Sequence, residues 1–152
     1  MSLLIVDDIP SQRILLKAIL NTNGYKDIQL AASAQDVFKQ LGIDNPEQPL
    51  TNINLIIMDI NMADINGIEA CHKIKAIPQL QDIPIIIMTG TPDEEKLQQA
   101  YQAGATDYLA KPINKFELLS RVQSALRLKQ EIDQRKQCKE ELKLLKENLK
   151  TT

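Results

Sequence analysis

Five polar side chains stand at or just beyond the ends of four short apolar runs in this sequence. Asp7 and Asp8 follow the first run, Asp59 and Thr89 end two others, and Lys111 follows the last. If the runs are parallel strands, their carboxyl ends share one edge of a sheet, where open α/β sheets bind ligands. Three carboxylates there would repel one another, since two unit charges ~4 Å apart cost ~4 kcal/mol at an effective dielectric of ~20. The cluster therefore requires a cation.

The ligand types favour magnesium as that cation. Carboxylate oxygens with room for water suit Mg2+, whereas the single histidine and the two widely spaced cysteines offer no zinc-ligand pattern. Lys111 adds a second positive charge, and Thr89 adds a hydrogen-bond donor. A carboxylate beside these groups can accept a phosphoryl group, because the metal ion and the amine neutralise the charge that develops on the phosphoryl oxygens.

Short apolar runs alternate with amphipathic segments along the chain, which is typical of repeated βα units and a parallel sheet. The first, third and fourth runs are continuously apolar, as expected for strands covered by helices on both faces. We therefore predict an α/β protein with a (βα)5 arrangement, a doubly wound five-stranded parallel sheet. The predicted strands are Leu3–Val6, Ile28–Ala31, Leu55–Met58, Ile83–Met88 and Thr106–Leu109.

Capping residues predict where the helices between these strands begin. Each stands three positions before an acid, as in a capping box. Apolar residues then recur at helical spacing, as Ile14, Leu15, Ala18 and Ile19 do in the first helix. The segment 44–52 carries two prolines and is predicted to be an extended loop. The four capping pairs are Ser33 with Asp36, Asn66 with Glu69, Thr91 with Glu94 and Asn114 with Glu117.

The last part of the chain predicts one long helix, because neither Gly nor Pro occurs from Ile113 to Thr152. At ~1.5 Å per residue it would run to roughly 60 Å. Leu118, Leu119, Val122, Ala125 and Leu126 can dock on the sheet. Beyond them, a heptad-like seam interrupted by Arg135 predicts a coiled-coil homodimer; a single solvated helix or a linker to a larger protein remains an alternative. The seam comprises Leu128, Ile132, Cys138, Leu142, Leu145 and Leu149.

Composition and charge bound the remaining possibilities. The chain has 43% hydrophobic residues, enough for a core, and no run near the ~20 apolar residues that cross a membrane. Its net charge of −2 divides into −5 over residues 1–116 and +3 over 117–152. The acidic body and the mixed charges of the tail argue against direct nucleic-acid binding. We expect a cytoplasmic protein without disulfides and without membrane contact.

Four segments give the chain a resemblance to the receiver domains of response regulators, which act in two-component signal transduction. They are Leu4-Ile5-Val6-Asp7-Asp8, Ile57-Met58-Asp59-Ile60-Asn61-Met62, Met88-Thr89-Gly90 and Tyr108-Leu109-Ala110-Lys111-Pro112. Their order and spacing resemble the family from residue 3 to about residue 127. The resemblance implies the strand order 2-1-3-4-5, a receiver domain over 1–127 and a helical extension, coiled coil or linker, over 128–152.

The resemblance also implies a role for each matching residue. Asp59 would accept a phosphoryl group from a sensor histidine kinase or phosphotransfer protein, and Lys111 would pair with Asp59 or its phosphate through a loop that has a cis bond before Pro112. Thr89 would move to hydrogen-bond the phosphoryl group, and Tyr108 would turn inward as the switch that alters the surface of helix 4, strand 5 and helix 5. The cofactor would be Mg2+, held by Asp8, Asp59, the backbone carbonyl of Asn61 and, through water, Asp7.

One departure from the family is visible, because Ala63 stands where many members have proline after the methionine. We expect a looser loop after Asp59 and altered kinetics rather than inactivity.

Two alternatives to a phosphorylated switch follow from the same residues. An aspartate-nucleophile phosphatase of the dehalogenase type would carry a second Asp two positions after the nucleophile, where this chain has Asn61. A degenerate receiver that only binds other proteins would not need the full acidic, threonine and lysine set. We therefore expect a signalling switch rather than an enzyme. The residues after 127 are too few for a DNA-binding domain, and the sequence does not identify the effector.

Overall fold

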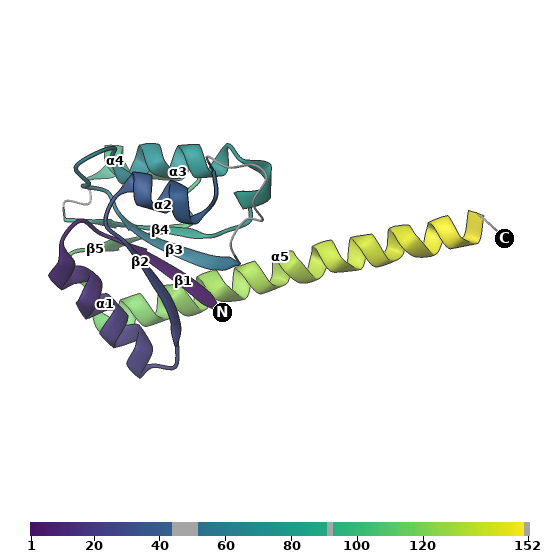
Figure 1. Cartoon of the computed structure of the whole chain (residues 1–152), viewed down its shortest axis with the longest axis horizontal. Coiled ribbons are helices and arrows are strands. Elements are labelled where there is room, and N and C mark those ends of the chain that lie inside the picture. Colours follow the sequence, from purple (N-terminus) through teal and green to yellow (C-terminus); the bar gives the residue numbers. More distant parts are fainter. Residues whose placement is uncertain (44–51, 91–92, 151–152) are drawn as a thin grey trace.

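A computed structural model describes residues 1–43, 52–90 and 93–150 of the chain, and within them five strands form one parallel sheet in the order β2-β1-β3-β4-β5 (Figure 1). The predicted fold and strand order are therefore confirmed. The strands are β1 (Ser2–Val6), β2 (Asp27–Ala31), β3 (Ile53–Asp59), β4 (Ile85–Thr89) and β5 (Asp107–Ala110). The helices are α1 (Pro10–Thr22), α2 (Ala34–Gln40), α3 (Gly67–Lys75), α4 (Glu94–Gln102), α5 (Lys115–Lys150) and the short 3-10 helix η1 (Pro78–Leu80).

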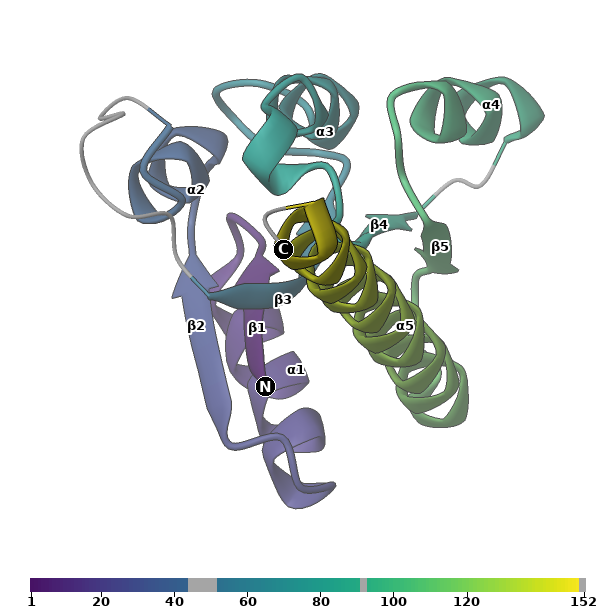
Figure 2. The ribbon, with the colours of Figure 1, turned by 90° about the vertical axis from the view of Figure 1, so that its right-hand side faces the viewer.

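Helices cover both faces of the sheet, with α1 and α5 on one side and α2, α3 and α4 on the other (Figures 1 and 2). Alternation along β1 shows how each face acquires its own core. Leu3 and Ile5 pack in a cluster with residues of α1 and α5, whereas Leu4 and Val6 pack in a cluster with residues of α2 and α3. This division arises because successive side chains on a strand point to opposite faces.

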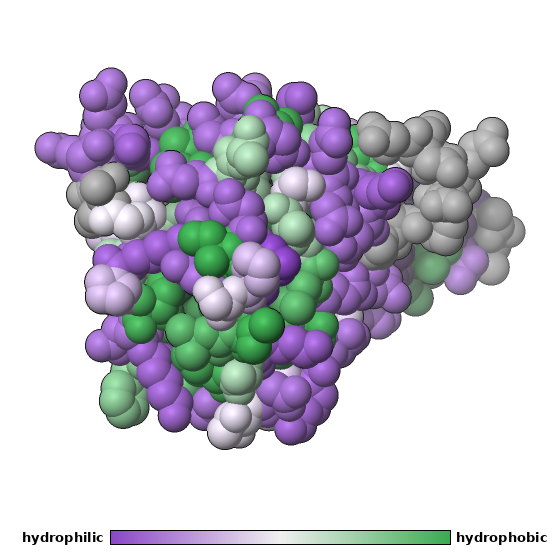
Figure 3. Space-filling model, turned by 60° about the vertical axis from the view of Figure 1, so that its left-hand side comes forward, coloured by the Kyte–Doolittle hydropathy of each residue, from purple (hydrophilic) through white to green (hydrophobic). Residues whose placement is uncertain are grey.

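Helix α1 carries two apolar stripes rather than one. Leu16 and Leu20 are buried against the sheet, whereas Ile14 is 65% exposed and Leu15 is 57% exposed. The helical recurrence of Ile14, Leu15 and Ala18 therefore does not mark the buried face. Figure 3 shows apolar side chains together on the side of the molecule that carries α1 and the start of α5.

Three of the four predicted helix starts are confirmed by their capping bonds. Ser33, Asn66 and Asn114 each accept a hydrogen bond from the backbone N–H three residues later. The prediction for α4 is wrong, because its cap is Asp93, whose carboxylate accepts from the Lys96 N–H at 2.7 Å. Asp93 stands immediately before the helix, where a short acidic side chain reaches that N–H directly. Thr91 and most of the predicted loop over 44–52 lie outside the described residues.

Strand β4 begins at Ile85 instead of the predicted Ile83. Pro84 precedes it and has no N–H to donate to a neighbouring strand. Its carbonyl oxygen still accepts from the Ile56 N–H, at 3.0 Å. The apolar run therefore extends two residues beyond the paired strand.

Helix α5 is a single element of 36 residues that continues past the sheet into solvent (Figures 1 and 2). Its first part is buried as predicted, at Leu118, Val122, Ala125 and Leu126. Farther along, the Lys136 ammonium pairs with the Asp82 carboxylate in the loop between η1 and β4. The helix continues without a break through residues 127 and 128, and the division into two domains there stays a prediction.

None of the helices in the described parts of the chain is long and apolar enough to cross a membrane. The two cysteines also differ sharply in their surroundings. Cys71 is buried in α3 and Cys138 is exposed on α5. Burial raises the pKa of the Cys71 thiol to about 11, so little of it is thiolate near neutral pH.

We expect iodoacetamide at pH 8 to add one carbamidomethyl group to the folded protein, at Cys138. Cys71 should react only after unfolding, because alkylation needs an accessible thiolate. Intact-mass measurement with and without urea checks this, and two rapid adducts on the native protein would contradict the packing of α3.

Candidate functional site

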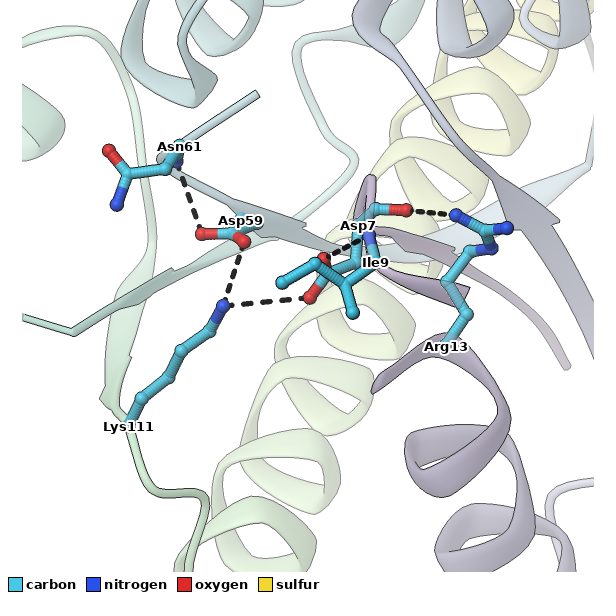
Figure 4. Close-up of polar contacts among 6 residues, drawn as sticks. All are labelled: Asp7, Ile9, Arg13, Asp59, Asn61 and Lys111. Carbon is cyan, nitrogen blue, oxygen red and sulfur yellow. Dashed lines mark hydrogen bonds and ion pairs between the residues drawn. The ribbon is translucent and has the colours of Figure 1, made fainter. Parts of the chain in front are cut away.

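Asp7, Asp59 and Lys111, which the sequence predicts at the strand ends, meet at the carboxyl edge of the sheet (Figure 4). Asp7 and Asp8 follow β1, and Asp59 is the last residue of β3. One carboxylate oxygen from each of these three lies within 4.8 Å of the others. Asp7 is fully buried and Asp59 is 1% exposed, whereas Asp8 faces solvent. The structure therefore brings together the acidic group that the sequence predicts.

Lys111 reaches this group from the loop after β5. Its Nζ donates to Asp59 Oδ2 at 2.7 Å and lies 3.6 Å from Asp7 Oδ2 (Figure 4). The Lys111 backbone N–H donates to the Thr89 carbonyl oxygen at 2.8 Å, and the bond to Pro112 is cis. The Lys111 ammonium thus lies between two carboxylates, while the Lys111 backbone is hydrogen-bonded to the end of β4.

The backbone around Asp59 is held by neighbouring strands and helices. Its Oδ1 accepts from the Asn61 N–H at 3.1 Å, and the Ile60 N–H donates to the Met88 carbonyl oxygen at 2.9 Å. On the other side, Gly67 begins α3 directly against the Asp59 backbone, and its N–H donates to the Ile60 carbonyl oxygen at 2.8 Å. A methyl group at Gly67 would lie 2.4 Å from the Asp59 carbonyl oxygen. Only glycine fits there without a shift.

The Asp7 carboxylate shows that the site is suited to a further cation. Its Oδ1 accepts from the Ile9 N–H at 2.9 Å, but its buried Oδ2 has no hydrogen-bond partner among the described residues. Burial, together with the charge of Asp59, raises the pKa of Asp7 above its ordinary value. Three carboxylates with one ammonium, an orphaned buried oxygen and an all-oxygen donor set fit a hard divalent ion such as Mg2+.

We expect Asp7→Asn to stabilise the metal-free protein. The amide removes one of three neighbouring negative charges and gives the orphaned position a donor, which corresponds to about 1–3 kcal/mol in the free energy of unfolding. Urea unfolding in EDTA at pH 7.5 measures the change. Stability equal to or below wild type would show that the ionised Asp7 is not under electrostatic strain.

Sequence reasoning missed one contact at the site. Arg13, in the first turns of α1, donates from Nη1 to the Asp7 carbonyl oxygen and holds the chain at the Asp7–Asp8 turn (Figure 4). In the sequence, only the position of Arg13 five residues after Asp8 indicates this contact. An arginine in the first turns of a helix is usually exposed to solvent, so the position alone does not predict it.

The two predicted switch residues lie on adjacent strands. Thr89 is the last residue of β4 and is 1% exposed, next to the site. Tyr108 lies on β5, where the Arg121 guanidinium is 5.4 Å from the centre of its ring. Arg121 also pairs with Asp107 at 2.6 Å and with Glu117 at 3.1 Å, so the ring is part of a charged cluster on β5 and α5.

Comparison with known proteins agrees with this geometry. The model of the response regulator receiver domain matches residues 3–123, and the chain belongs to that family. It is 32% identical to the transcriptional regulatory protein YvrH of Bacillus subtilis, over 83% of this chain and 49% of that protein. It is 31% identical to the response regulator PleD of Caulobacter vibrioides, over 89% of this chain and 28% of that protein.

A solved structure, that of a putative response regulator from Chloroflexus aurantiacus, has a TM-score of 0.73 and 31% identity, covering 83% of this chain and 97% of that one. The chain spans about half or less of the length of the two curated relatives. It is a receiver domain of a two-component response regulator, a class of signalling switch.

Proposed function

We propose that this receiver accepts a phosphoryl group on Asp59 from a histidine kinase or phosphotransfer protein, in a Mg2+-dependent reaction in the cytoplasm. The observation that carries the proposal is the buried Asp59 carboxylate, with the Lys111 ammonium 2.7 Å from one oxygen and two further carboxylates close by. Such a cluster costs stability through repulsion. It offers what phosphoryl transfer needs, an anionic nucleophile among groups that neutralise charge.

Asp59 supplies the nucleophile. One carboxylate oxygen forms a bond to phosphorus while the donor's bond to phosphorus breaks, and the leaving group keeps that electron pair and takes a proton from solvent. Asp8, Asp59 and the Asn61 carbonyl would hold Mg2+, with Asp7 acting through water; when bound, the ion neutralises charge on the phosphoryl oxygens. Lys111 lies where it can follow that charge from the carboxylate onto the phosphoryl group.

The resulting acyl phosphate acts as a signal. It adds charge and acceptor oxygens, and the Thr89 hydroxyl and the Lys111 ammonium are the nearby donors. Thr89 ends β4 just ahead of α4, so its movement shifts the chain leading into that helix. An inward turn of Tyr108 removes its ring from Arg121 and changes the surface of α4, β5 and α5. We assign the chain no enzymatic activity beyond slow self-phosphorylation and self-dephosphorylation.

The exposed apolar residues of α1, Ile14 and Leu15, form the surface that we assign to the phosphoryl donor. It borders the site, since Leu15 lines a small groove with Lys111, Pro112 and Ile113. Phe116, in the first turn of α5, is 82% exposed. A donor protein seated there would bury apolar surface and hold its phosphoryl group near Asp59.

We expect Leu15→Ser to slow phosphorylation by the donor kinase roughly tenfold and to leave phosphorylation by acetyl phosphate unchanged. The small molecule needs no docking surface, whereas the protein loses apolar contact. Radiolabelled transfer compared with acetyl phosphate labelling measures both rates, and Leu144→Ser is the matched control, because Leu144 is 61% exposed on α5 and lies outside the predicted seam. Equal slowing with both donors would place the defect in the site itself.

For α5 we propose a parallel homodimer. Residues 128, 135, 142 and 149 recur every seven positions, and at 3.6 residues per turn this stripe faces away from the residues buried on the sheet. Leu142, Leu145 and Leu149 are 55%, 60% and 76% exposed. Ile132, included in the predicted seam, is half-buried and lies toward the sheet-facing side, so it contributes little to such a dimer.

The decisive experiment is intact-mass measurement after incubation with acetyl phosphate and Mg2+, on wild type and Asp59→Ala. We expect one phosphoryl group on the wild type and none on the variant, with EDTA blocking the reaction. Light scattering on the same samples reports whether the mass of the assembly changes. A wild type that binds no Mg2+ and gains no mass would support the degenerate interaction module instead.

A further inference from the structure

The Asp64 side chain links the loop between β3 and α3 to the beginning of α2, which lies about thirty residues earlier in the chain. It lies in the loop between β3 and α3, and its carboxylate accepts from the backbone N–H of Gln35 at 2.9 Å and of Ala34 at 3.3 Å. Those are the first two N–H groups of α2. Desolvation alone would raise the pKa of Asp64, but these backbone donors, with that of Ile65, hold it below its ordinary value.

Helix α2 has a cap of its own and does not depend on this contact alone. Ser33 accepts from the Asp36 N–H at 3.1 Å, as helix N-caps usually do. Asp64 satisfies the two N–H groups that Ser33 does not reach, and its negative charge suits the positive end of the helix dipole. The contact therefore also constrains the loop that carries Asp64.

That loop runs from the phosphoacceptor strand to α3. It is attached at one end by the Ile60 N–H, which donates to Met88, and at the other by the Gly67 N–H, which donates to Ile60. Between these points lie Asn61, whose carbonyl is assigned to Mg2+ above, and Asp64. The Asp64 carboxylate ties this stretch to α2 only three residues after Asn61.

We propose that Asp64 is a positioning residue, which holds the β3–α3 loop against α2 so that the Asn61 carbonyl is presented to Mg2+. The inference rests on the proposed function, because it assumes that Asn61 is a ligand. The loop has Ala63 just before Asp64, so no proline restricts its backbone there. The side-chain tether supplies the restriction instead, and the chain avoids the entropy cost of ordering a free loop when the ion binds.

The test compares Mg2+ affinity, measured by isothermal titration calorimetry, in the wild type and in Asp64→Ala, Asp64→Asn and Ser33→Ala. Asp64→Ala is expected to weaken Mg2+ binding about tenfold, the lower end of the losses seen when groups that orient metal ligands are removed. Asp64→Asn keeps one acceptor oxygen and should fall between it and wild type. Ser33→Ala removes the other cap of α2 without touching the loop, so its Mg2+ affinity should match wild type.

Unfolding temperature in EDTA separates positioning from simple helix stability. Asp64→Ala and Ser33→Ala should both lower it, because each deletes a cap of α2. Equal loss of Mg2+ affinity in these two variants, or unchanged affinity in Asp64→Ala, would overturn the inference. Identical affinities for Asp64→Asn and Asp64→Ala would attribute the effect to charge alone and overturn it too. A wild type that binds no Mg2+ would instead overturn the proposed function on which it rests.

Discussion

Lys111→Met is expected to slow phosphorylation of Asp59 by acetyl phosphate roughly 100-fold while leaving Mg2+ affinity unchanged or tighter. The rate falls because the ammonium 2.7 Å from Asp59 no longer neutralises the charge that develops during transfer, and the loss of one such group typically costs about 10²–10³ in rate. Mg2+ binding does not fall, since the lysine and the ion are like charges that share one carboxylate. Intact-mass time courses and calorimetric titration measure the two quantities.

Lys111→Arg is the matched control, because it keeps the charge and changes its shape. It should transfer faster than the methionine variant but below wild type, since the guanidinium must fit a space that holds a compact ammonium between Asp7 and Asp59. A methionine variant that loses transfer and Mg2+ binding in equal measure would indicate that Lys111 only supports the fold of the site.

Gly67→Ala is expected to destabilise the protein by about 1–3 kcal/mol and to impair phosphorylation together with it. The added methyl group would lie 2.4 Å from the Asp59 carbonyl oxygen and 2.9 Å from the Ile60 Cα. Both contacts are backbone, so neither neighbour can rotate away. Either α3 or the end of β3 must shift, and the end of β3 carries Asp59, the proposed nucleophile. Urea unfolding and acetyl phosphate labelling measure the two effects.

Gly90→Ala is the control, because it adds the same methyl group at another glycine on the carboxyl edge of the sheet, directly after β4. A Cβ there meets no atom of the described residues within 4 Å, so stability should stay within about 0.5 kcal/mol of wild type. Unchanged stability and labelling in Gly67→Ala would show that α3 moves freely relative to the phosphoacceptor strand, contrary to the packing in the structure.

The strands and the acidic group were predictable because both follow from local patterns. Four of the five predicted strands are followed by polar residues, and a parallel sheet places the carboxyl ends of its strands at one edge. These patterns predict that Asp7, Asp59 and Lys111 share that edge of the sheet. The strand order and the part of Asn61 came from resemblance to a family, since no local pattern specifies which strands are neighbours.

Sequence reasoning missed two contacts, one that joins distant parts of the chain and one between residues only six apart. Asp64 caps a helix that begins thirty residues earlier, and Arg13 reaches back to a carbonyl group, which every residue has. In the sequence, neither Asp64 nor Arg13 can be distinguished from a solvent-exposed charged residue by its type or by its position in a motif. The two stripes of α1 are a similar case, because helical periodicity reveals that Ile14 and Leu16 are apolar but not which of them faces the sheet.

Because α5 is one uninterrupted helix, a small change in its angle at the sheet produces a larger displacement at its far end. The helix contacts the domain as far as Lys136, which pairs with Asp82, and ends at Lys150, roughly 21 Å farther at ~1.5 Å per residue. A tilt of ~5° at that last contact therefore moves the far end by ~2 Å, because a continuous helix bends little over this length. If the proposed switch moves Tyr108 and Arg121, we therefore expect a larger displacement at Lys150 than at the sheet, without contact between the proposed phosphorylation site and a partner bound to the end of the helix.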